Sequence, residues 1–175
     1  TGGMTTGNFG LVYLLHEIAF EFGPDWVTAR WLGFATGLRA TVLLLSAAVA
    51  LLSRRRSILA GSTLLLLAHF VSYFHVWEHH MSGVVVLGLL LLLTLIRGPT
   101  EHSDTQPCRP NSTTICLVIL ALIALALPTP FAVLDAAHDW DFPRRVILTL
   151  SKALPTLVLY IVALRAQLNP EGSTS

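Results

Sequence analysis

Charged residues are scarce in this chain, and their shortage is the first constraint on what it can be. Only 12% of the 175 residues are charged, against about 25% in an ordinary soluble domain. By contrast, 54% are hydrophobic and the mean hydropathy is +0.69. A soluble core of this length does not need so much apolar sequence. The composition therefore predicts a membrane protein with a single domain, 1–175.

An excess of basic residues and a cysteine motif are also missing. The formal net charge is +1, which excludes the broad basic surface expected of a nucleic-acid-binding protein. Cys108 and Cys116 have no CxxC spacing, so they predict neither a zinc site nor a redox pair. The first ten residues, TGGMTTGNFG, lack the basic segment of a signal peptide.

Long apolar segments dominate what is present. A helix rises about 1.5 Å per residue and needs roughly 20 mostly apolar residues to cross the hydrocarbon. The segments are continuously apolar rather than alternating, which favours helices over strands. Five segments are predicted to span the membrane, at 31–53, 58–77, 81–96, 114–134 and 146–164.

A shorter segment, GLVYLLHEIAFEFG, precedes the first span and ends at the breaker Gly23–Pro24. Its apolar residues fall at helical spacing, at Leu11, Leu14, Leu15, Ile18 and Phe22. This pattern predicts an amphipathic helix that lies at the membrane interface. The predicted fold class is therefore all-α, a polytopic bundle of about five transmembrane helices plus an N-terminal interfacial helix.

Arginines in the short loops predict the orientation of the bundle. Six of them fall at one end of the spans, at Arg54, Arg55, Arg56, Arg97, Arg109 and Arg165. Three fall at the other end, at Arg30, Arg144 and Arg145. We therefore expect a multi-pass protein of the cell membrane with its N-terminus outside, its C-terminus cytoplasmic and a flexible cytoplasmic loop at 97–113.

This orientation gathers titratable side chains at the outer end of the bundle. Arg39, His69 and Lys152 lie roughly 9 to 12 Å below the outer boundary, at 1.5 Å per residue. A charge inside the bilayer costs several kcal/mol unless it is paired or hydrated. The shared depth predicts one polar cavity that binds substrate through Arg39, His69 and Ser72, with Lys152 as a catalytic group. Alternatively, the two cations extend to the interface or form a structural lock with acidic residues.

The stretch FHVWEHHMSG, at 74–83, is the densest polar motif. On a helix, His75, Glu78 and His79 would lie on one face, and two imidazoles with a carboxylate suit Zn, Fe or Cu. The motif therefore predicts a divalent metal site, with Glu78 as a catalytic candidate. Its metal ligands are His75, His79, His80 and His138. Two alternatives remain, namely haem b held through His69 and a simple solvated hairpin tip.

Two family resemblances accompany these motifs. HVWEHH resembles one histidine box of the membrane desaturases, which use three boxes. The segments LLSRRRSILAGSTLLLL and HVWEHHMSGVVVLGLLLLL resemble the DoxX-like and horizontally transferred transmembrane domain (HTTM) families over residues 31–96. That second resemblance implies a small multi-helix membrane bundle and a role in quinone- or thiol-linked redox chemistry, or a relation to the vitamin-K-dependent carboxylase membrane region. No catalytic residue of these families maps onto this chain.

Together, these features predict a redox-linked or metal-dependent membrane enzyme, or a subunit of one, with its site at the outer face. One alternative is a small-anion binding or transport module. Another is a structural subunit of a larger membrane complex, because Gly83 and Gly88 permit close helix approach. The expected partners are the lipid bilayer, other membrane subunits and a quinone or small anionic ligand.

Overall fold

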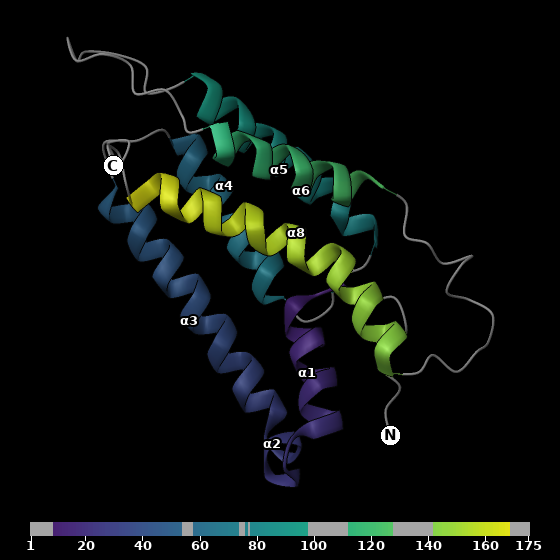
Figure 1. Cartoon of the computed structure of the whole chain (residues 1–175). Coiled ribbons are helices and arrows are strands. Elements are labelled where there is room, and N and C mark those ends of the chain that lie inside the picture. Colours follow the sequence, from purple (N-terminus) through teal and green to yellow (C-terminus); the bar gives the residue numbers. More distant parts are fainter. Residues whose placement is uncertain are drawn as a thin grey trace.

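The longest helix, α8 (Phe142–Leu168), lies at the centre of the computed structural model (Figure 1) and contacts five other helices. The structure describes residues 9–53, 58–73, 76, 78–97, 112–127 and 142–168, without the side chains of residues 78 and 97. Within this part of the chain there are seven helices and no strand. The all-α prediction is therefore confirmed.

The other six helices follow the apolar segments of the sequence closely. Their bounds are α1 Leu11–Phe22, α2 Asp25–Ala29, α3 Trp31–Leu52, α4 Ile58–Ser72, α5 Glu78–Arg97 and α6 Ser112–Ala126. Helix α1 ends at Phe22, and Gly23 follows as its cap, where a β-carbon would lie 2.3 Å from the carbonyl oxygen of Ala19. Only glycine fits that close approach.

Three of the helices, α3, α5 and α8, are long and apolar enough to cross a membrane. Helices α4 and α6 have 15 residues each, which is about 22 Å of helix against a hydrocarbon thickness of about 30 Å. Helix α4 ends at Ser72, five residues before the predicted end, and residues 128–134 of the fourth predicted span lie outside the described part. Helix α5 begins earlier than predicted, at Glu78.

Side-chain contacts fix which helix ends lie together. Ser53 Oγ donates to the carbonyl oxygen of Gln167 at 3.0 Å, so α3 and α8 end at the same end of the bundle. The hydroxyls of Ser46 and Tyr160 are 2.9 Å apart and join the same two helices closer to their middles. The start of α3 and the α4–α5 corner lie toward the other end (Figure 1), and the end of α6 meets α8 at Lys152.

Helices α5, α6 and α8 approach one another closely at Gly88. A β-carbon added to Gly88 would lie 2.7 Å from a methyl carbon of Leu122 and 2.9 Å from one of Leu159. The absence of a side chain at Gly88 therefore lets three helices approach closely, as predicted for this residue. Gly83 has only an ordinary contact, 3.6 Å from the Phe70 ring.

Helix α1 packs against α8 and against the end of α4 (Figure 1). The backbone N–H of Phe9 donates to the carbonyl oxygen of Val76 at 2.7 Å, which ties the start of α1 to the α4–α5 corner. The buried side of α1 is formed by Val12, Tyr13 and Leu14. Three residues of the predicted apolar face remain exposed, namely Leu15, Ile18 and Phe22.

Candidate functional site

Three helices bring a cation and several rings together at the α4–α5 corner. The guanidinium carbon of Arg39 on α3 lies 5.1 Å from the centroid of the Tyr73 ring. The imidazole of His69 on α4 stacks on the same ring, with centroids 5.0 Å apart and planes 22° apart. Tyr73 directly follows α4, four residues after His69, so one helical turn places both rings on one face.

The ring contacts continue from α4 to α5. Phe70 lies 5.7 Å from His69 and 6.3 Å from His80, measured between ring centroids. The rings of His79 and His80 are 4.1 Å apart. His69 also interacts electrostatically with Arg39 and His80. We call this group the Arg39 cluster, and its members are Arg39, His69, Phe70, Tyr73, His79 and His80.

Within the Arg39 cluster, the guanidinium of Arg39 carries a permanent positive charge. No described carboxylate forms an ion pair with Arg39. Its cation–π contact with Tyr73 contributes about 1 kcal/mol. An intramembrane charge costs several kcal/mol, so this contact alone does not offset the cost. An anionic group bound at Arg39 would offset that cost.

Lys152, the third residue of the predicted cavity, has its partners on α6. Its ammonium donates to the carbonyl oxygens of Ala124 at 3.2 Å, Leu125 at 3.0 Å and Leu127. The structure thus brings Arg39 and His69 together through Tyr73 and places Lys152 at the end of α6. The catalytic role of Lys152 stays a prediction.

Ser72, the other predicted substrate-binding residue, is buried in the core of the helix bundle. Its side chain is 2% exposed. The hydroxyl donates to the carbonyl oxygen of Ala68 at 2.7 Å, within its own helix. A serine bonded in this way has its donor engaged with the backbone.

The metal-site prediction rested on a helical spacing that the structure does not have. Helix α4 ends at Ser72, Val76 is not helical and α5 begins at Glu78. Val76 therefore interrupts the continuous helix that the prediction assumed, and the metal site itself stays a prediction. His75, His138 and the side chain of Glu78 lie outside the described part. Among described residues, no group of three or more His, Cys, Asp or Glu residues is placed to hold a metal.

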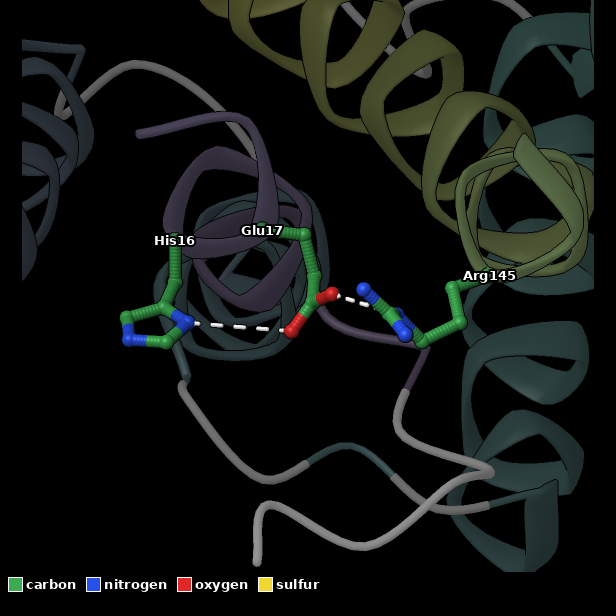
Figure 2. Close-up of polar contacts among 3 residues, drawn as sticks. All are labelled: His16, Glu17 and Arg145. Carbon is green, nitrogen blue, oxygen red and sulfur yellow. Dashed lines mark hydrogen bonds and ion pairs between the residues drawn. The ribbon is translucent and has the colours of Figure 1, made fainter. Parts of the chain in front are cut away.

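A second polar cluster joins α1 to the first turn of α8 (Figure 2). Arg145 Nε donates to Glu17 Oε2 at 2.6 Å. The other oxygen of Glu17 lies 3.8 Å from Nδ1 of His16. Only 11% of the Glu17 side chain is exposed, so this ion pair is screened less than a surface pair.

The surroundings of Glu17 shift the pKa values of its neighbours on α1. Burial and the nearby Glu17 carboxylate raise the pKa of Tyr13 to about 12, so the phenol stays protonated beside the anion. Burial lowers the pKa of His16, and Glu17 opposes that shift. The Trp31 ring meets His16 edge-on, with centroids 5.3 Å apart. These contacts hold α1 against α8 and α3.

Sequence reasoning missed two of these features. Tyr73 carried a usable signal, because an aromatic residue four positions after an intramembrane histidine shares its helix face. The Glu17–Arg145 pair had no local signal, since 128 residues separate its members.

Comparison of the chain with protein-family models, with curated proteins and with solved structures found no match. Its function is therefore argued from the geometry of its own residues.

Proposed function

We propose that this is an integral membrane protein that binds an anionic or quinone-like molecule from the lipid at the Arg39 cluster. We further propose that it serves redox-linked membrane chemistry, as a small enzyme or as a subunit of one. One observation carries the proposal. Arg39 lies within an apolar helix, stacks on Tyr73 beside His69, and has no carboxylate partner among the described residues.

The chemistry of the cluster suits such a ligand. A guanidinium donates paired hydrogen bonds to a phosphate, a carboxylate or a quinone oxygen. The rings of Tyr73 and His69 offer flat surfaces against which a quinone ring can stack. Exposed leucines flank the cluster, with Leu38 on α3 and Leu66 on α4, and an apolar tail can lie along them.

The imidazoles of the cluster give it a route for proton exchange. His69, His79 and His80 supply three imidazoles, and imidazole is the commonest proton donor and acceptor in enzymes. Reduction or oxidation of a quinone requires proton transfer at its oxygens. The imidazoles account for the two protons of such a step, and its two electrons would come from a separate redox partner.

The orientation of the protein in the membrane is part of the same proposal. The α4–α5 corner faces the outside of the cell membrane, and the C-terminus is cytoplasmic. Helices α4 and α6 are the two remaining members of the five proposed spans, and the exposed face of α1 rests in the interface. The resemblance of residues 31–96 to the DoxX-like and HTTM families agrees with a small redox-linked membrane bundle.

The proposal is tested by identifying what the purified protein holds. Wild type, Arg39→Gln and Arg165→Gln would be extracted with solvent, and the released molecules measured by mass spectrometry. Arg165 is an exposed arginine near the C-terminal end of α8, away from the Arg39 cluster, and serves as the matched control. We expect an anionic or quinone-like amphiphile in wild type and in Arg165→Gln, and about tenfold less in Arg39→Gln, since a charged hydrogen bond contributes about 1.5–3 kcal/mol.

Equal amounts of the amphiphile in all three proteins would contradict the proposal. An optical and elemental spectrum of the same samples separates it from the cofactor alternatives. Bound metal or haem in wild type, lost with His79→Ala and His80→Ala, would assign the cluster to a cofactor instead.

A structural subunit of a larger complex is the second candidate, and the exposure of α3 favours it. Only 11% of the α3 span is buried, against 50% of the α8 span. A partner helix would cover the free face of α3. A discrete larger species on a native gel of mildly solubilised membranes, absent after overexpression of this chain alone, would support that role.

A further inference from the structure

The only lysine of this chain lies inside the bundle. Ten other basic residues are all arginines, and Lys152 is 3% exposed in the middle third of α8. Lysine and arginine are not interchangeable, because an ammonium is a compact charge with three donors. A single lysine at a buried position therefore points to a site shaped for a small cation.

That site is the C-terminal end of α6. A helix leaves its last carbonyl groups without partners in the helix. Here, the carbonyl oxygen of Ile123 accepts from the backbone N–H of Leu127 at 3.0 Å. Three further carbonyl oxygens, from Ala124, Leu125 and Leu127, accept from the ammonium of Lys152.

The physical setting makes this arrangement a cation site. Helix α6 has only 15 residues and is too short to bring both ends into water. Its C-terminus carries the negative end of the helix dipole. Carbonyl oxygens at the ends of interrupted helices are ligands for monovalent cations in membrane proteins. Leu148, Thr149 and Thr156, one turn before and after Lys152 on α8, are also buried, each at most 4% exposed.

We propose that the end of α6 is a monovalent-cation site and that the ammonium of Lys152 is its resident cation. The ligand class is an ammonium-sized monovalent cation, and the ligands are the three carbonyl oxygens. The hydroxyl of Thr156 donates to the backbone carbonyl of Lys152 at 2.8 Å and steadies the turn that carries the ammonium. This site uses α6 and α8 and does not depend on the function proposed for the Arg39 cluster.

Removal of the tethered ammonium opens the site to a free ion. Lys152→Ala removes both the charge and the stem, so three carbonyl oxygens face an empty space. Lys152→Met removes the charge but fills the space with an apolar stem. A free monovalent cation therefore fits the alanine variant and not the methionine variant, and this difference identifies the site.

The test is thermal unfolding of both variants in detergent with added ammonium, methylammonium, potassium or sodium chloride. Choline chloride at the same concentration controls for ionic strength. We expect both variants to unfold at a lower Tm than wild type. At least one of the four salts should restore at least half of the loss in Lys152→Ala, in a saturable manner, and none should do so in Lys152→Met.

The proposal is overturned if no salt restores Lys152→Ala beyond the choline control, or if both variants respond alike. A wild-type measurement covers the case in which neither variant folds. Because the chain has one lysine, protein labelled with side-chain ¹⁵N-lysine gives one ammonium signal. We expect a protonated nitrogen whose hydrogens exchange slowly with water. A neutral amine or a rapidly exchanging ammonium would contradict the assignment.

Discussion

At the scale of single residues, two intramembrane cations at similar predicted depth have different surroundings. Lys152 is surrounded by carbonyl oxygens from α6, whereas Arg39 meets the faces of aromatic rings. The negative end of the α6 dipole offsets part of the charge of the ammonium. The guanidinium has no such partner in the described residues, and this difference is why the ligand-binding proposal rests on Arg39.

The Glu17–Arg145 ion pair gives a further prediction at this scale. Glu17→Gln leaves Arg145 with a weaker acceptor and Tyr13 beside a neutral amide. We expect the free energy of unfolding to fall by about 1–3 kcal/mol, the cost of an uncompensated polar group. Chemical or thermal unfolding in detergent would measure the change.

Glu21→Gln is the matched control, because Glu21 lies one turn further along α1 and is exposed. A surface substitution of this kind changes stability by no more than about 0.5 kcal/mol. If the two variants lose the same stability, the ion pair does not fasten α1 to α8.

At the scale of elements, short helices are the feature that the bundle must accommodate. Helices α4 and α6 have 15 residues each, too few to cross the hydrocarbon, so inside a bilayer their last carbonyl groups would have no water to pair with. Lys152 donates hydrogen bonds to the carbonyl oxygens at the end of α6. The close contact at Gly88 holds α5 against α6 and α8, so that α5 covers one side of the short helix α6.

Substitution of Gly88 tests that packing. Gly88→Leu places a side chain where Leu122 and Leu159 already sit, so α5 must move away. We expect a loss of about 1–3 kcal/mol, as for other overpacked cores, seen as a lower Tm in detergent. Gly37→Leu is the control, since nothing lies within 4 Å of a β-carbon built at Gly37. A similar loss in both variants would contradict the packing account.

The sequence predicted helix positions better than helix ends. The first span was predicted at 31–53 and α3 is Trp31–Leu52, because a long apolar run leaves no alternative to a helix. The end of α4 was missed because apolar residues continue past Ser72 without a local breaker. The start of α5 was missed because Glu78, His79 and His80 look like loop residues, yet they form its first turn.

At the scale of the whole molecule, the predicted gathering of titratable groups has a geometric basis. The start of α3, the α4–α5 corner and the start of α8 share one end, which carries the Arg39 cluster and the Glu17–Arg145 pair (Figure 1). The opposite end carries Arg165. The meeting of Arg39 with His69 was predictable because they share a depth on the consecutive helices α3 and α4. The place of Lys152 was not predictable, because depth does not say which neighbouring helix a side chain meets.

Sidedness is the prediction that belongs to this scale. In a background with Cys108→Ser and Cys116→Ser, we expect His79→Cys to react with a membrane-impermeant maleimide added to intact cells. Arg165→Cys, exposed at the other end of α8, should react only after the cells are opened. The reverse pattern would place the Arg39 cluster on the cytoplasmic side.

The most direct measurement of the central claim is a binding titration in nanodiscs. Wild type, Arg39→Gln and Arg165→Gln would be titrated with fluorescent short-chain lipids that carry a phosphate or a choline headgroup, and with a short-chain quinone as competitor. We predict that wild type and Arg165→Gln bind the phosphate lipid or the quinone saturably, and about tenfold more tightly than Arg39→Gln does. Equal affinity of wild type and Arg39→Gln for every ligand would contradict a binding site at Arg39.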